Sequence, residues 1–113
     1  MTKWVTAKTK YVRIPPRKAR LAADLIRGLS VEEASAQLTF CQLKAGKLLQ
    51  KTLHSAVANA ENTLDVERGH LEIKEVKVDV GPVLKRSKSK NRGGRVSVMK
   101  RTSHFTIVVG ASE

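Results

Sequence analysis

The feature that most restricts the fold of this 113-residue chain is a basic stretch at residues 81–104, GPVLKRSKSKNRGGRVSVMKRTSH. It holds eight Lys or Arg among 24 residues and no Asp or Glu, so it is too charged to be buried in a core. Alternating apolar residues flank it on both sides, in LEIKEVKVDV and FTIVV. This arrangement predicts a long antiparallel hairpin whose base packs on a core and whose outer part, residues 81–104, leaves it.

The net charge of +12 is unevenly distributed. Residues 1–27 carry eight basic side chains and one acidic one, residues 28–80 carry six and eight, and residues 81–113 again carry eight and one. We therefore expect a near-neutral body with two basic regions that bind a polyanion. At this length the chain is expected to form one domain, residues 1–113.

Several classes of protein are disfavoured. Cys41 is the only cysteine, which excludes an internal disulfide and favours a buried structural thiol in a reducing cytosol. No apolar run approaches the roughly 20 residues that span a bilayer, and residues 1–10 contain no signal-peptide core, so we expect no membrane partner. His54, His70 and His104 are dispersed, without a carboxylate pair or Gly-rich phosphate loop. We expect no enzymatic activity, metal site, cofactor or small-molecule substrate.

The N-terminal part predicts a strand followed by a helix. Residues 4–12 mix β-branched and aromatic residues with lysines, which is typical of a strand at or near a sheet edge. Two prolines then favour a helix that begins at Pro16 and ends before Gly28. The buried stripe of this helix is predicted to contain Ala19, Ala22, Leu25 and Ile26.

Two more helices are predicted before the basic stretch. Ser30 and Glu33 form a capping-box pattern, which indicates the start of a short second helix. A third helix, over residues 42–62, carries small and apolar residues at spacings of three and four. Its buried face is predicted to contain Ala45, Leu49, Thr52, Leu53, Ala56, Val57 and Ala60.

The strand over residues 71–80 carries apolar residues in two phases, so the alternation slips at Lys74 and Glu75 and predicts a β-bulge there. The returning strand presents Phe105, Ile107 and Val109 on one face. A tip near residues 92 and 93 would pair positions that sum to 185, although any odd sum keeps the apolar residues on one face. The predicted pairs are Val80 with Phe105, Val78 with Ile107, and Val76 with Val109.

These elements predict an α+β fold in which three helices pack on a small antiparallel three-stranded sheet. Two of the strands continue into a long protruding β-hairpin, which projects roughly 40 Å at about 3.3 Å per residue. An isolated two-stranded ribbon is marginal in water, so we expect a partner to order it.

The basic side chains of the hairpin suit neutralisation of phosphates. If eight cations engaged phosphates, log affinity would fall with log salt with a slope of about 6 to 7. The alternatives are a solvated charged loop or a nuclear-import-like basic patch. Two glycines near the tip permit a tight turn or a close backbone approach. The candidate binding residues are Lys85, Arg86, Lys88, Lys90, Arg92, Gly93, Gly94, Arg95, Lys100, Arg101 and His104.

A second basic cluster lies where the first strand meets the first helix. A helix N-terminus adds amide donors to side-chain cations, so a phosphate fits there, although ordinary surface lysines explain the pattern equally well. Aromatic residues are absent from the basic hairpin, which favours recognition of shape and backbone over base stacking. The candidate residues of this cluster are Lys8, Lys10, Arg13, Arg17, Lys18 and Arg20.

Four sequence blocks resemble one known family. YVRIPPRKARLAADLIRG (11–28), SAVANAE (55–61), VDVGPVLKR (78–86) and KRTSH (100–104) are similar, in the same order, to bacterial large-subunit ribosomal protein twenty-two. The resemblance covers nearly the whole chain. The chain departs from the family pattern at Ser87, Lys88 and Ser89, where relatives often carry an apolar residue and a proline, and at Pro15, where a serine is common.

The resemblance implies a structural, cytoplasmic protein of the large ribosomal subunit that binds large-subunit rRNA and acts early in subunit assembly. It implies that the globular part lies near the opening of the peptide exit tunnel and that the hairpin lines the tunnel wall. Neighbouring ribosomal proteins and the nascent polypeptide would then be its other partners. A DNA-bending protein with a basic β-arm is the alternative, although Pro82, the proline nearest the arm, lies at its base and not at its tip. A small nuclease would need a general base and usually a metal site.

Overall fold

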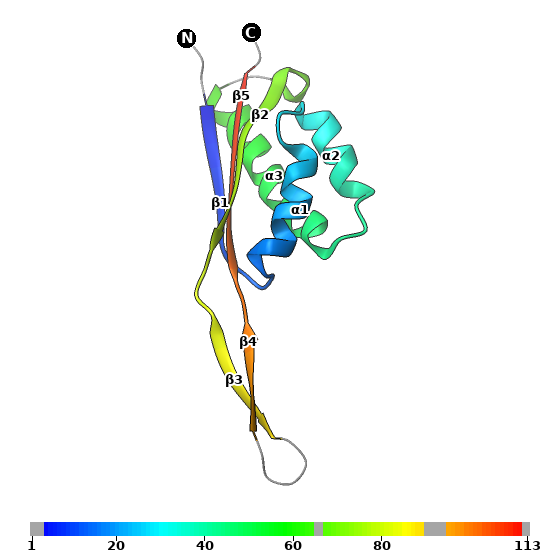
Figure 1. Cartoon of the computed structure of the whole chain (residues 1–113). Helices are drawn as coiled ribbons and strands as arrows, with labels where there is room; N and C mark the ends of the chain where they lie inside the picture. Colours follow the sequence, from blue (N-terminus) through cyan, green and yellow to red (C-terminus); the bar gives the residue numbers. More distant parts are fainter. Residues whose placement is uncertain (1–3, 65–66, 90–94, 112–113) are drawn as a thin grey trace.

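The computed structural model describes residues 4–64, 67–89 and 95–111 (Figure 1). The chain begins with strand β1 (Trp4–Val12), which leads into three helices: α1 (Pro16–Ile26), α2 (Val31–Thr39) and α3 (Lys44–Leu64). A short 3-10 helix, η1 (Arg68–His70), precedes the remaining strands. These strands are β2 (Leu71–Val80), β3 (Leu84–Ser89), β4 (Arg95–Lys100) and β5 (Ser103–Ala111).

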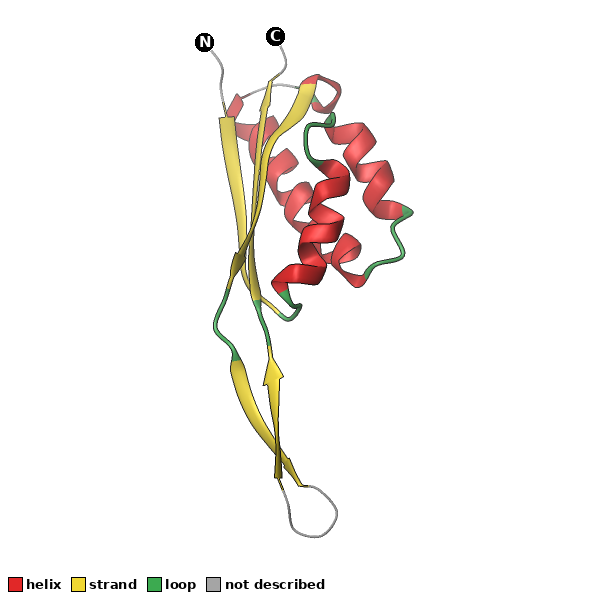
Figure 2. Cartoon of the chain, in the orientation of Figure 1, coloured by secondary structure: helices red, strands yellow, loops and turns green. Residues whose placement is uncertain are grey.

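The strands form two antiparallel sheets. The larger sheet has the order β1-β5-β2, and the smaller one consists of β3 and β4. Helices α1, α2 and α3 lie on one side of the larger sheet, and β3 and β4 continue from β2 and β5 beyond it (Figure 2). The molecule is elongated, measuring 64 × 24 × 17 Å along its principal axes. Three helices on an antiparallel three-stranded sheet confirm the predicted α+β fold.

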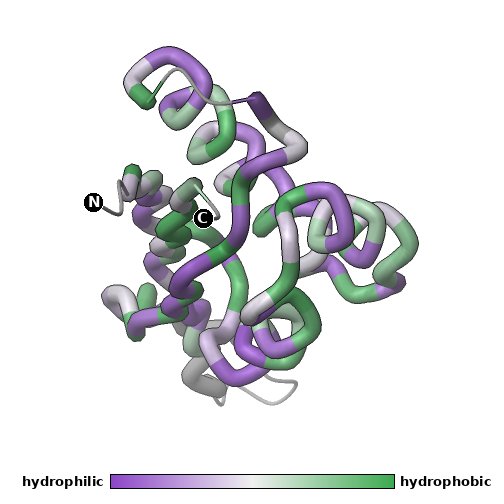
Figure 3. Tube along the Cα trace, turned by 90° about the horizontal axis from the view of Figure 1, so that it is seen from above, coloured by the Kyte–Doolittle hydropathy of each residue, from purple (hydrophilic) through white to green (hydrophobic). Residues whose placement is uncertain are grey.

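The core lies between the three-stranded sheet and the helices. The central strand β5 supplies Phe105, Ile107 and Val109, and α3 supplies Leu49 and Leu53, all with no exposed surface. Seen from above, the helices lie to one side of the strands, and hydrophobic and hydrophilic residues alternate along both (Figure 3). All seven predicted core positions of α3 are buried, which confirms the pattern read from that helix.

Helix α1 turns a different stripe toward the core than predicted. Ala19, Ala22 and Ile26 are buried as expected, but Ala23 is buried in place of Leu25, which is 46% exposed. At 100° per residue Leu25 lies about a third of a turn from the centre of the buried stripe, so the prediction for it is wrong. Its exposure leaves an aliphatic side chain on the solvent side of α1.

Helix α2 begins at the predicted cap. The Glu33 amide donates to Ser30 Oγ at 3.3 Å, which confirms that half of the capping box. The helix ends at Thr39 with Phe40 as its C-cap, and α3 follows at Lys44, two residues later than predicted. Cys41 lies in this connection and is only partly buried, because the connection runs at the margin of the core; the expectation of a buried thiol is wrong.

The pairing of β2 with β5 contains the predicted bulge and corrects the predicted register. The register shifts between Ile73 and Glu75, which confirms the β-bulge inferred from the phase slip. Beyond the bulge, however, Val78 pairs with Phe105 and Val80 with Ser103, so partner numbers sum to 183 and not to 185. Because the difference is two, the apolar residues stay on the same face, but Val80 loses its expected apolar partner and is 66% exposed.

Candidate nucleic-acid interface

The arm, defined here as β3, β4 and the residues between them, carries most of the predicted binding residues. Six residue pairs hold its strands together, from Leu84 with Lys100 to Ser89 with Arg95. The side chains of Lys85 and Lys100 are exposed. The backbone of Arg86, Lys88 and Arg95 lies in the paired strands. Four predicted residues lie outside the described part of the chain, namely Lys90, Arg92, Gly93 and Gly94.

The arm root, defined here as residues 80–83 and 101–104, joins the arm to the domain through buried polar contacts. Ser103 is fully buried, and its Oγ donates to the carbonyl of Ile14 at 2.6 Å. Thr102 is 4% exposed, and its Oγ1 donates to the carbonyl of Pro82 at 2.6 Å. These two hydroxyl groups tie the returning strand to the loop before α1 and to the outgoing strand, so they fix how the arm leaves the domain.

Close backbone packing at the arm root requires a glycine at position 81. The Gly81 amide donates to the carbonyl of Thr102 at 3.0 Å. A Cβ at position 81 would lie 2.5 Å from Thr102 Oγ1 and 3.2 Å from the Thr102 carbonyl carbon. The two strands approach so closely there that a side chain at position 81 would force Thr102 to shift.

Arg20 and Arg27 join α1 to the free edge of the sheet. β2 is an edge strand, and its outward carbonyl groups need donors. Arg20 Nε and Nη2 donate to the carbonyl of Val78 at 3.3 and 3.2 Å, and Arg27 Nη2 donates to the carbonyl of Val76 at 3.0 Å. Arg27 also pairs with Asp24. Arg20 was predicted to contact phosphate; in the structure it joins α1 to the edge strand.

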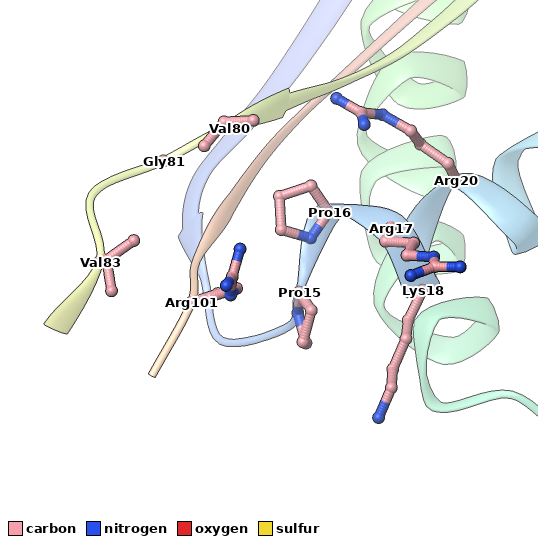
Figure 4. Close-up of a pocket in the computed structure, with 9 residues that line it drawn as sticks. All are labelled: Pro15, Pro16, Arg17, Lys18, Arg20, Val80, Gly81, Val83 and Arg101. Carbon is pink, nitrogen blue, oxygen red and sulfur yellow. The ribbon is translucent and has the colours of Figure 1, made fainter. Parts of the chain in front are cut away.

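A cavity of about 340 Å³ opens between α1 and the arm root. Arg17, Lys18 and Arg20 line it from α1, and Val83 and Arg101 line it from the arm root (Figure 4). Among the described residues no acidic side chain lines it. The fold thus brings cations from both predicted clusters to one concave surface, where a phosphate group would be attracted from two sides. Its complete lining is Pro15, Pro16, Arg17, Lys18, Arg20, Val80, Gly81, Val83 and Arg101.

The remaining candidates of the N-terminal cluster lie elsewhere. Lys8 and Lys10 are exposed on β1, on the sheet face opposite the helices, because the alternate residues Ala7 and Thr9 point to the core and to α3. Arg13 lies in the loop before α1, beside a second groove. The predicted cluster is therefore divided between two faces of the domain.

His104 contributes to the arm root through Tyr11. The Tyr11 amide donates to His104 Nδ1 at 3.1 Å, and the two rings meet edge to face with centroids 5.0 Å apart. Tyr11 has a φ of +60°, a conformation that is rare for a residue with a side chain, at the irregularity in the pairing of β1 with β5. This backbone position directs the Tyr11 amide out of the strand ladder and toward the histidine.

Sequence reasoning missed two kinds of residue at this interface. Thr102 and Ser103 were not among the candidate residues, and both are buried and hydrogen-bonded. Val80 and Val83 were not expected to line a cavity. One feature of the sequence could have indicated the role of Thr102 and Ser103: two hydroxyl residues lie between the basic stretch and an apolar strand. At such a position, buried backbone groups need side-chain hydrogen-bond partners.

Within residues 4–64, 67–89 and 95–111, no three His, Cys, Asp or Glu side chains lie close enough together to hold a metal ion. No helix in the described part of the chain is long and apolar enough to cross a membrane.

Comparison with known proteins identifies the family. A family model described as ribosomal protein L22p/L17e matches residues 7–110. The chain belongs to this family. It is 66% identical over 106 residues to large ribosomal subunit protein uL22 of Protochlamydia amoebophila (strain UWE25), covering 94% of this chain and 96% of the relative. It is 60% identical over 107 residues to the protein of the same name from Chlamydia pneumoniae, covering 95% of this chain and 96% of the relative.

Membership of the L22p/L17e family confirms the resemblance found in the four sequence blocks. The chain is a structural, cytoplasmic constituent of the ribosome and not an enzyme, as predicted. The match spans β1 to β5, so it includes both the domain and the arm.

Proposed function

We propose that this protein is a structural component of the large ribosomal subunit that binds large-subunit rRNA through its arm and through the cavity at the arm root. In this proposal the domain lies near the opening of the peptide exit tunnel and the arm lines the tunnel wall, beside the nascent polypeptide. The protein contacts neighbouring large-subunit proteins and contributes to early assembly of the subunit. Family membership and the distribution of positive charge support this assignment.

The observation that carries the proposal is the meeting of two basic regions at one cavity. Arg17 and Lys18 come from α1, and Arg101 comes from the arm root. All three side chains are exposed, and no salt bridge joins them to a carboxylate among the described residues. An RNA strand in this cavity would contact the domain and the arm together, which couples RNA binding to the direction of the arm.

The aromatic residues support recognition of RNA shape and backbone over base stacking. Trp4 lies under the Lys74 ammonium group, whose Nζ is 5.2 Å from the ring centroid, and Tyr11 contacts His104. Phe105 is fully buried. Phe40 is 84% exposed but lies between α2 and α3, away from the arm. The cationic surfaces of the domain and the arm therefore offer charge and hydrogen-bond donors to an RNA backbone in place of stacking surfaces.

A salt-dependence experiment tests the role of the cavity. The full chain and the double variant Arg17→Ala/Arg101→Ala would be titrated with large-subunit rRNA at several salt concentrations. Removing two phosphate contacts should reduce the slope of log affinity against log salt by about 1.5 to 2. An unchanged slope would contradict binding at the cavity.

The matched control is Lys74→Ala/Lys77→Ala, which removes the same charge. Lys74 and Lys77 already pair with Glu72 and Glu75 at 3.4 Å, so their loss should leave the slope nearly unchanged. Competition with duplex DNA at physiological salt distinguishes the alternative function. A preference for DNA over large-subunit rRNA would support an architectural DNA-binding protein and exclude the ribosomal RNA proposal.

A further inference from the structure

A second concave surface lies on the helical side of the domain and adjoins the arm root cavity, with which it shares Pro15 and Lys18. We call it the aliphatic groove; it has a volume of about 490 Å³ and lies between the loop before α1, α1 itself and the start of α3. Its floor is apolar, with Ile14 and Ala45 almost fully buried. Its lining consists of Arg13, Ile14, Pro15, Lys18, Leu21, Leu43, Lys44 and Ala45.

The walls of the aliphatic groove expose large apolar side chains. Leu21 is 60% exposed and Leu43 is 41% exposed. Leu25, 46% exposed, lies one turn beyond Leu21 on the same face of α1 and extends the apolar surface along the helix axis. Neither the core nor the RNA surface proposed above uses these leucines. Adjacent exposed leucines beside a hollow are typical of a binding surface for another apolar element.

The rim of the groove has the opposite character from its floor. Arg13, Lys18 and Lys44 surround it, and no acidic side chain lines it among the described residues. The Lys44 ammonium group donates to the carbonyl of Arg13 at 3.4 Å, which holds one cation across the mouth of the groove. A ligand of this groove therefore needs an apolar face flanked by negative charge.

We propose that the aliphatic groove binds an amphipathic helix of a second protein, with aliphatic side chains on one face and Asp or Glu beside them. Leu21 and Leu25 are spaced four apart on α1, and Leu43 lies across the groove. Such a row accepts the side chains of a facing helix at spacings of three and four, as in helix-in-groove recognition. The acidic residues of the partner helix then meet Arg13, Lys18 and Lys44.

RNA fits this groove less well than a protein helix. The rim cations suit phosphate, but the walls consist of leucine side chains, which neither stack on bases nor hydrogen-bond their edges. The three cations of the groove stand at its rim, around walls and a floor made largely of aliphatic side chains. Burial of Leu21, Leu25 and Leu43 favours an aliphatic partner, since each contributes to binding only when its surface leaves water.

Site-specific photo-crosslinking in the assembled large subunit tests this proposal. The groove proposal rests on the proposed function only because it places the partner protein in the large ribosomal subunit. The full chain would carry p-benzoylphenylalanine in place of Leu21, and the crosslinked partner would be mapped by mass spectrometry. We expect a protein segment that is helical, acidic and aliphatic on one face. A crosslink to rRNA alone, to a protein segment without these features, or to nothing would overturn the proposal.

Charge and position controls sharpen the result. In the Leu21 crosslinking background, Lys44→Glu should reduce the crosslink yield about threefold or more, because an attractive contact at the rim becomes repulsive. Lys44 does not line the arm root cavity, so the RNA contacts proposed there are left intact. An unchanged yield would contradict the role of the basic rim. The same photoreactive residue at Glu33, exposed on α2 outside the groove, should not capture that segment.

A probe in the arm separates this proposal from the proposed function. With p-benzoylphenylalanine at Met99, which is 57% exposed, the arm should crosslink to rRNA. An rRNA crosslink at Met99 without a protein crosslink at Leu21 would overturn only the groove proposal. A protein crosslink at Leu21 without an rRNA crosslink at Met99 would contradict only the rRNA-binding arm.

Discussion

The paired strands β2 and β5 and the paired strands β3 and β4 are successive parts of one hairpin, but they are stabilised differently. In the first pair, Phe105, Ile107 and Val109 lie under the helices with no exposed surface. In the second pair, side chains such as Lys85 and Met99 are exposed. Burial of apolar side chains therefore stabilises the pairing of β2 with β5. The pairing of β3 with β4 depends on the hydrogen bonds between the two strands, and a two-stranded ribbon alone is only marginally stable in water.

The arm root lies between the buried pair, β2 and β5, and the exposed pair, β3 and β4. There the stabilising contacts are neither apolar packing nor the strand ladder, but buried hydroxyl groups that donate to carbonyls of Ile14 and Pro82. Such contacts depend on direction, since a hydrogen bond weakens as its angle closes. The root therefore sets the orientation of the arm while contributing less to the stability of the domain than the core does.

The largest expected effect comes from the core. Phe105→Ala removes a fully buried aromatic side chain from the central strand and should lower the free energy of unfolding by about 3 to 5 kcal/mol. Met99→Ala, in the exposed arm, should change it by less than about 0.5 kcal/mol. Urea unfolding of the free protein measures both. Comparable losses in the two variants would show that the arm is part of the cooperative core.

A smaller effect is expected at the arm root. Ser103→Ala leaves the buried carbonyl of Ile14 without its donor, which should cost about 1 to 3 kcal/mol. Ser55→Ala, at an exposed position of α3, is the matched control and should be nearly neutral. The same unfolding measurement applies, and a neutral Ser103→Ala would show that another donor or a water molecule replaces the hydroxyl group.

The strands and the main core were predictable from the sequence because side-chain periodicity reflects burial. β1 and β2 occupy the predicted residues, and the phase slip at Lys74 located the bulge. A strand has a period of two, so an extra residue reverses the face of everything beyond it and becomes visible in the sequence. Periodicity failed for Leu25, where an apolar residue lies on the outer face of α1.

The register was not predictable because it depends on a difference in length between the two sides of the arm root. Partners sum to 184 in the arm and to 183 at the base, since residues 81–83 lie opposite residues 101 and 102. The predicted register assumed a hairpin with strands of equal length on both sides of its tip, and that assumption cannot reveal the extra residue in 81–83. The sequence also could not show that Arg17 and Arg101 share a cavity, because that proximity depends on how α1 packs on the sheet.

A third effect, local to the arm root, is expected from Gly81→Ala. The new methyl group would displace the Thr102 hydroxyl group, so the hydrogen bond to Pro82 is lost and the free energy of unfolding falls by about 1 kcal/mol. Gly69→Ala is the control, because a Cβ there makes only an ordinary contact, at 3.7 Å from Glu32 Oε1. If both variants unfolded at the same urea concentration as the native chain, close approach at Gly81 would not matter for stability.

The smallest expected effect on stability comes from the arm itself, and it is paired with a large effect on binding. The triple change Lys88→Ala/Lys90→Ala/Arg92→Ala removes three charges from the basic stretch, which is too charged to form part of a core, so the thermal melting of the free protein should stay nearly unchanged. Up to three phosphate contacts would be lost, and the salt slope for large-subunit rRNA should fall by about 2 to 3. A loss of several degrees in melting temperature would instead mean that the arm folds back on the domain, and the separation between a core-stabilised base and a partner-stabilised arm would be wrong.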